Sequence, residues 1–125
     1  MIAPWLFVAT AVAGGVGAAL RLVVDGAVRS TWSAPIPLAT LVINVSGSFV
    51  LGLLTGLADH AGLPREWLLV AGGGLMGGYT TFSTASVETV RLLAEKKRVA
   101  GIANGAGMLL LAVAAGLVGL IIGTS

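Results

Sequence analysis

Hydrophobic residues gather in four long runs along the chain, and polar residues are concentrated in the short segments between them. Each run is close to the ~20 residues that a helix needs to cross a bilayer. The four predicted spans are Ile2–Val24, Pro37–Ala58, Trp67–Leu93 and Val99–Gly123. The pattern therefore predicts an all-α integral membrane protein with four transmembrane helices, in one domain that covers residues 1–125.

The third run is longer than a single span requires. Its ~27 residues would form a helix of ~40 Å, against a hydrocarbon core of ~30 Å. Glycines at 72–74 and 77–78 are followed by the hydroxyl residues Thr80 and Thr81, and glycine clusters let a backbone leave helical geometry. Within a membrane, non-helical backbone occurs only where protein or a water-filled cavity surrounds it. We expect the third helix to be broken near Gly77–Thr81, in a pore or binding element.

Composition and charge support the membrane class. Hydrophobic residues make up 57% of the chain and charged residues 10%, and the chain has no cysteine, which excludes disulfides and thiolate metal sites. Basic side chains gather in the segment Lys96–Arg98, and Arg29 follows the first span, whereas the opposite side has Arg65. Because Lys and Arg favour the cytoplasmic side of short loops, both termini are predicted to lie outside the cytoplasm. This distribution suits the surface of a lipid bilayer better than a nucleic acid.

A polar stripe follows one side of the second span. On an α-helix, Thr40, Asn44, Gly47, Ser48 and Thr55 fall within about one quadrant. The Asn44 side chain carries two N–H donors. Two interpretations remain open, because such groups either line a path through the membrane or bond neighbouring helices to one another.

Two charged residues fall near the basic end of the predicted bundle. Glu88 lies in the third span and is costly in a membrane unless it is paired or near water. Arg21 lies close to the end of the first span, which runs in the same direction as the third, so the two residues should lie at similar depth. We predict that they pair or share a polar vestibule. The alternative is that each side chain reaches the interface independently.

Small residues spaced by four recur in the apolar runs and permit close helix contact, which favours a dimer or larger assembly. These sets are Gly14 with Ala18, Gly73 with Gly77, Gly74 with Gly78, Gly101 with Gly105, and Ala115 with Gly119 and Gly123. Catalytic patterns are absent from the sequence: no nucleophile–base pair is visible, and the glycine run lacks the Lys-Ser/Thr ending of a phosphate loop. The chain is not predicted to be an enzyme.

The segment Gly77–Glu88, GGYTTFSTASVE, closely resembles the GG-x-TTFSTFS-x-E signature of the CrcB/Fluc fluoride channels. Further matches are Gly14–Gly17 leading to Arg21, and Leu41–Phe49 in the second span, so the resemblance covers roughly residues 14 to 91. It implies a fluoride-selective channel that lets cytoplasmic fluoride leave down its electrochemical gradient, in the plasma membrane of a prokaryote. It also implies an antiparallel dimer with two narrow pores and a sodium ion at its centre.

Individual roles follow from the same resemblance. Asn44 would donate to fluoride, Phe82 would offer its ring edge, and Gly77 and Thr80 would hold Na⁺ through backbone carbonyls. The full set of pore residues implied is Thr40, Asn44, Ser48, Phe82, Ser83 and Thr84. Such groups suit fluoride, because N–H, O–H and aromatic C–H dipoles replace its tightly held water without a fixed charge that would trap the ion. Carbonyls of an unwound helix likewise suit sodium.

The sequence departs from the family pattern at three places. Ala85 stands where the signature has its second phenylalanine, and Ala39 stands where a glycine is usual. The fourth span has no tyrosine or serine at the expected place, where Asn104, Gly105, Gly107 and Met108 occur. A homodimer inserted both ways round would also need balanced basic charge. We therefore expect a heterodimer with a paralogous subunit of opposite charge bias.

Other functions are weighed against the channel. A small multidrug exporter would need an acidic residue in the first span, and Ile2–Leu20 has none. A potassium filter is suggested by Gly77-Gly78-Tyr79, but the order of carbonyl-bearing residues differs. A non-conducting accessory subunit, with its hydroxyls serving only to bond helices, is the non-transport alternative.

Overall fold

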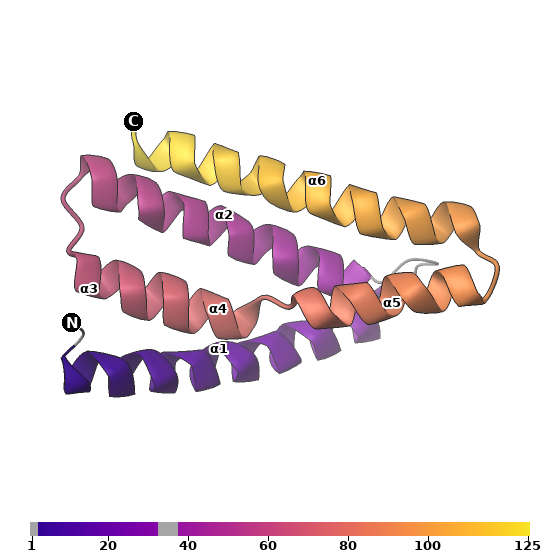
Figure 1. Cartoon of the computed structure of the whole chain (residues 1–125), viewed down its shortest axis with the longest axis horizontal. Helices are drawn as coiled ribbons and strands as arrows, with labels where there is room; N and C mark the ends of the chain where they lie inside the picture. The colour runs from indigo at the N-terminus through magenta and orange to yellow at the C-terminus, as the bar shows by residue number, and fades with distance from the viewer. Residues whose placement is uncertain (1–2, 33–37) are drawn as a thin grey trace.

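The structure is a computed structural model that describes residues 3–32 and 38–125, except for the side chains of residues 82–84 (Figure 1). Every regular element in the described part is helical, which confirms the predicted all-α class. The elements are α1 (Pro4–Thr31), α2 (Leu38–His60), α3 (Arg65–Trp67), η1 (Leu68–Met76), α4 (Gly77–Tyr79), α5 (Phe82–Ala94) and α6 (Arg98–Gly123). The start of α1 and the end of α6 lie at the same end of the bundle (Figure 1).

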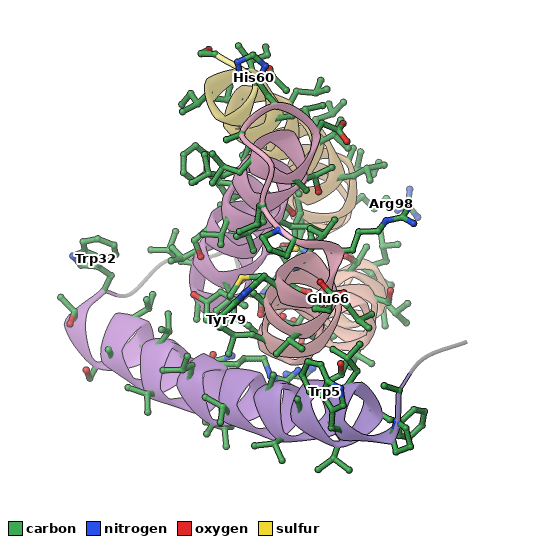
Figure 2. All side chains as sticks on the ribbon, turned by 90° about the vertical axis from the view of Figure 1, so that its left-hand side faces the viewer. Trp5, Trp32, His60, Glu66, Tyr79 and Arg98 are labelled. Carbon is green, nitrogen blue, oxygen red and sulfur yellow. The ribbon has the colours of Figure 1, made fainter. Side chains whose placement is uncertain are left out.

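Three of the described helices, α1, α2 and α6, are long and apolar enough to cross a membrane. Their most apolar stretches are only 6%, 22% and 11% buried, respectively, so most of this surface faces outward. Side chains such as Phe7, Leu22 and Val99 are exposed, and Trp32 points away from the bundle (Figure 2). Water would oppose such exposure by ~25 cal/mol per Å² of apolar surface, whereas lipid would not. The chain is an integral membrane protein.

Helix α1 continues past the predicted end of the first span at Val24 and ends at Thr31. Its last turns contain an ion pair four residues apart, with Arg29 Nε 2.9 Å from Asp25 Oδ1. This spacing stabilises a helix, and the arginine lies near the negative end of the helix dipole. Sequence analysis predicted that these residues follow the first span, because hydropathy shows only where the apolar residues end. The helix itself continues beyond that point.

The third apolar run is divided, as predicted. Residues 65–79 are helical, Thr80 adopts extended backbone with φ −79° and ψ 160°, and α5 begins at Phe82. Figure 1 shows α3, α4 and α5 nearly in line, joined by a short non-helical connection. Most of the first half, Leu68–Met76, is a π-helix. The sequence predicted the break but not this wider hydrogen-bond register.

Glycines allow the helices to approach closely. A methyl group at Gly52 or Gly119 would overlap a backbone oxygen of the facing helix, which joins α2 to α6. Gly17 and Gly78 make the same kind of contact between α1 and the first half of the broken run. Gly78 and Gly119 belong to the predicted sets of small residues spaced by four, whereas Gly17 and Gly52 do not. Gly77 differs, because a methyl group there would have no neighbour within 4 Å.

Candidate functional site

Asn44 of α2 bridges the break in the third run. Its Nδ2 donates to the backbone oxygen of Thr81 at 2.9 Å, and its Oδ1 accepts from the backbone N–H of Thr81 at 2.9 Å. One side-chain amide therefore bonds both backbone polar groups of a residue that lies outside the helices. Unpartnered backbone groups are costly inside a membrane, so Asn44 stabilises the non-helical connection.

The same arrangement changes the partners of the α4 carbonyls. In a continuous helix the Thr81 N–H would donate to the Gly77 carbonyl, but here it donates to Asn44. The backbone N–H of Thr80 still donates to Met76 O at 2.9 Å, and the Thr80 hydroxyl donates to that same oxygen. The Gly77 carbonyl therefore loses its usual helical donor.

Helix α2 presses directly on this break. A methyl group at Gly47 would overlap the Thr80 methyl group and lie 3.1 Å from the Tyr79 ring. One residue earlier, the Ser46 hydroxyl lies 3.0 Å from the Tyr79 hydroxyl. Figure 2 shows Tyr79 inside the bundle. Glycine at 47 is therefore required for close approach, and the Ser46 bond fixes the Tyr79 ring beside it.

Glu88 of α5 is bonded to α2. The Thr40 hydroxyl donates to Glu88 Oε1 at 2.6 Å, and Thr40 is 1% exposed. Within the described part of the chain, no hydrogen bond or ion pair joins Glu88 to Arg21, so the predicted pairing is not found there. The physical reason is that α1 packs mainly on η1 and α4, whereas α5 packs on α6. The nearest donor to Glu88 then comes from α2.

An open groove of about 760 Å³ lies beside the break. It is bordered by α2, the first half of the broken run, α5 and α6. Its polar lining consists of amide and hydroxyl side chains. They belong to Asn44, Ser48, Thr80, Thr81, Ser86, Thr89 and Asn104. Among the residues that line it, none is charged.

The structure divides the predicted site residues into groups. Asn44 and Ser48 line the groove together with Gly77 and Thr80. Thr40 instead lies with Glu88, and Thr55 lines a second cavity of about 630 Å³ near Arg65. The predicted contributions of Phe82, Ser83 and Thr84 concern side chains outside the described ones. Ala85, the departure from the signature, also lines the groove.

One part of the site was not predicted. Asn104 of α6 donates from Nδ2 to the Thr89 hydroxyl of α5 at 2.7 Å, and both residues line the groove. The sequence held a usable signal, because Asn104, Met108 and Ala112 are spaced by four and so share one face of α6. Because the rest of that helix is apolar, this face was not recognised as part of a site.

Mostly outward-facing apolar surface, a broken helix and an uncharged groove are features of an integral membrane protein. The family model described as CrcB-like protein, Camphor Resistance (CrcB), matches residues 8–124. The chain belongs to this CrcB family, which is a family of ion channels and not of enzymes.

Curated relatives are similar over nearly their whole length. A protein of Leifsonia xyli subsp. xyli, named Fluoride-specific ion channel FluC 1, is 52% identical over 96% of this chain and 88% of its own. A protein of Mycolicibacterium paratuberculosis named Fluoride-specific ion channel FluC 2 is 48% identical over 94% of this chain and 92% of its own length. A protein of Cutibacterium acnes with the same name is 45% identical over 90% of this chain and 92% of its own length.

Proposed function

We propose that this chain is a subunit of a fluoride-selective channel that lets cytoplasmic fluoride leave down its electrochemical gradient and so lowers fluoride toxicity. The observation that carries the proposal is an uncharged groove, with amide and hydroxyl groups among its lining, beside a break that Asn44 braces. The names of the relatives, fluoride-specific ion channels, support the choice of ion.

The chemistry of the groove suits a small anion. Fluoride holds its water tightly, so a pore must replace that shell with N–H and O–H donors. A fixed positive charge would add several kcal/mol of attraction in a low-dielectric site and hold the ion there. The described lining is mostly apolar, and its polar side chains are all uncharged amides and hydroxyls. Such a lining favours passage over tight binding.

One of the two N–H groups of the Asn44 side chain has only a weak acceptor and so can donate to fluoride. Its first amide N–H is occupied by the Thr81 carbonyl, at 2.9 Å from Nδ2. Its second faces Met108 Sδ at 3.5 Å, and a thioether is a weak acceptor. Fluoride would displace that sulfur contact without disturbing the bond that braces the break. Phe82, Ser83 and Thr84 would complete the path beyond Asn44, with Ser48 along its wall.

A second subunit would close the groove. One chain leaves the groove and most of its apolar surface open, and a methyl group added at Gly77, which lines the groove, would meet nothing within 4 Å. We propose an antiparallel dimer in the plasma membrane. Each subunit would cross the membrane four times, once with the broken third run, and both termini would lie outside the cytoplasm. The basic segment Lys96–Arg98 lies at one end of the bundle, and Ala85 leaves one aromatic ring missing. Both features, and the numerals 1 and 2 in the relatives' names, favour a paralogous partner.

Sodium would bind at the end of α4 through the Gly77 and Thr80 carbonyls. The donor set fits, because the Gly77 carbonyl lacks its helical donor and glycine leaves its approach open. Backbone oxygens suit a hard monovalent cation. When bound there, the ion would supply positive charge to two helix ends that each present carbonyls.

The proposal is tested by fluoride efflux from liposomes, measured with a fluoride electrode. The chain is reconstituted alone and with its neighbouring paralogue. We expect rapid efflux from the pair and little from the chain alone. Full efflux from the chain alone would exclude the heterodimer. No efflux from either preparation would exclude the channel. If efflux from the pair persists after Asn44→Asp, the second candidate function is favoured, which is a non-conducting accessory subunit. The apolar residues Ala85 and Met108 in the lining of the groove support this candidate.

A further inference from the structure

Tyr79 is held between two helices at the edge of the break. It is the last residue of α4, directly before the non-helical Thr80. Its hydroxyl lies 3.0 Å from the Ser46 hydroxyl of α2, and a methyl group at Gly47 would lie 3.1 Å from its ring. On the other side, a methyl group at Gly17 of α1 would lie 2.8 Å from its backbone nitrogen. The Tyr79 ring is therefore packed against α2 and its backbone against α1.

The hydrogen bond between Ser46 and Tyr79 has a defined direction. The Ser46 hydroxyl donates to the Ile43 carbonyl at 3.2 Å, so its single proton is used. Its oxygen then accepts, and the Tyr79 hydroxyl is the donor. Both side chains are half-buried, and neither is among the residues that line the groove. The bond is therefore separate from the proposed path of the conducted ion.

Helix α2 holds the break from both sides. Successive residues of an α-helix are about 100° apart around its axis, so Gly47 lies between Asn44 and Ser46 on the surface of α2. Gly47 faces the break, and Asn44 bonds the Thr81 backbone beyond it at 2.9 Å. Ser46 bonds Tyr79 before it. The Ser46 bond is thus the counterpart, on the near side of the break, of the Asn44 bonds on the far side.

We propose that Tyr79 is a positioning residue for the sodium ion proposed at the end of α4, with Ser46 as its anchor. Gly77 and Thr80, whose carbonyls would bind the ion, lie two residues before Tyr79 and one residue after it. A rotation of the Tyr79 backbone therefore changes the direction of one carbonyl relative to the other. Because Ser46 and Gly47 hold the ring, the two carbonyls keep one arrangement. An ion binds more tightly to ligands that are already arranged, since the apparent dissociation constant rises as the competent fraction falls. The inference rests on the proposed function and on the sodium site within it.

The test measures how sodium changes stability, in the chain assembled with its paralogue and purified in N-methyl-D-glucamine. Sodium that binds only the folded state raises the free energy of unfolding once its concentration exceeds the dissociation constant. Unfolding by denaturant in detergent is followed by circular dichroism at increasing sodium and constant ionic strength. Tyr79→Phe removes only the hydroxyl, so the sodium concentration at which stabilisation begins should rise about fivefold, the effect of one lost hydrogen bond. A bond that served the fold alone would lower stability equally with and without sodium, and that result would overturn the proposal.

Ser46→Ala removes the acceptor of the same bond and should have the same effect as Tyr79→Phe. The double variant should be no worse than either single one, because both break one interaction; additive effects would contradict the proposal. Ser30→Ala, which removes an exposed hydroxyl bonded to its own helix, is the control for Ser46→Ala and should behave as the wild type. Ser46→Ala also decides the matter if Tyr79→Phe does not assemble, as judged by size-exclusion elution.

The wild type separates this inference from the proposals beneath it. A wild type that sodium stabilises, with variants that keep its sodium dependence, refutes only this inference. A wild type that sodium does not stabilise refutes the sodium site and this inference together. Fluoride efflux from the same preparation in liposomes decides the proposed function separately.

Discussion

At the scale of single residues, Asn44 combines two tasks within one amide. One N–H and the oxygen brace the Thr81 backbone, and the other N–H faces a weak acceptor, Met108. Helical periodicity and the family signature both identified Asn44, since its type and spacing are visible in the sequence. Its bond to the break was not predictable, because it depends on how α2 is rotated against the third run. The same rotation gave Glu88 the Thr40 hydroxyl as partner.

Replacing Asn44 by Asp should abolish conduction. The substitution keeps the shape and the acceptor for Thr81 N–H but removes both donors. It also sets a negative carboxylate opposite the Thr81 carbonyl and in the path of an anion. We expect fluoride efflux to fall at least ~100-fold, which corresponds to ~2.7 kcal/mol, in the liposome electrode assay. Ser125→Ala, which removes an exposed hydroxyl bonded to its own helix, is the control and should leave efflux unchanged. Retained efflux in Asn44→Asp would show that the ion does not pass this residue.

Replacing Thr40 by Val tests the bond to Glu88. Valine matches the shape of threonine but cannot donate to the carboxylate. Loss of a hydrogen bond to a charged group costs about 1.5–3 kcal/mol, so the reconstituted protein should unfold at lower denaturant concentration when followed by tryptophan fluorescence. Thr40→Ser keeps the donor and should recover most of that stability. If valine and serine variants unfold together, the 2.6 Å contact does not stabilise the fold.

At the scale of elements, the broken third run organises the molecule. Its position followed from glycines and hydroxyl residues next to one another in an apolar run, since these residue types loosen a helix. The π-helical register of Leu68–Met76 had no such signal, because hydropathy records side chains and not backbone bonds. The length of α1 was missed for a related reason: its last turns are polar but still helical, stabilised by the pair Asp25–Arg29.

Gly47→Ala should separate α2 from the break. The added methyl group would overlap the Thr80 methyl group and crowd the Tyr79 ring. Overpacking of this kind costs about 1–3 kcal/mol, so both stability and fluoride efflux should fall. Gly26→Ala is the matched control, because a methyl group there meets nothing within 4 Å. Alanine in a helix interior is favoured by up to about 1 kcal/mol over glycine, so that variant should be as stable as wild type or more so. Equal behaviour of the two variants would contradict the close packing of α2 on the break.

At the scale of the whole molecule, the groove of one chain is open along one side. The groove is open, its walls come from four segments, and the apolar surface of α1, α2 and α6 is mostly uncovered. The paralogous partner, expected from the charge bias of the sequence and from Ala85, stays a prediction. The contribution of α6 was not predicted, because Asn104 departs from the family pattern in that span and its bond to Thr89 depends on how α6 packs on α5.

Sodium removal tests the proposed centre of the dimer. Replacing sodium by N-methyl-D-glucamine throughout purification and reconstitution should lower fluoride efflux several-fold, because the carbonyls at the end of α4 would then face one another without a cation. Adding sodium back should restore the rate. Efflux that is the same in both cations would remove the ion from this account.

The central claim is that a small anion passes a groove of neutral donors beside a braced break. It is tested most directly by measuring fluoride and chloride release from the same liposomes, containing this chain with its paralogue, under a potassium ionophore. The account predicts rapid fluoride release while chloride is retained, since the donors replace only a small ion's water shell. Retention of both halides, or release of chloride as fast as fluoride, would contradict it.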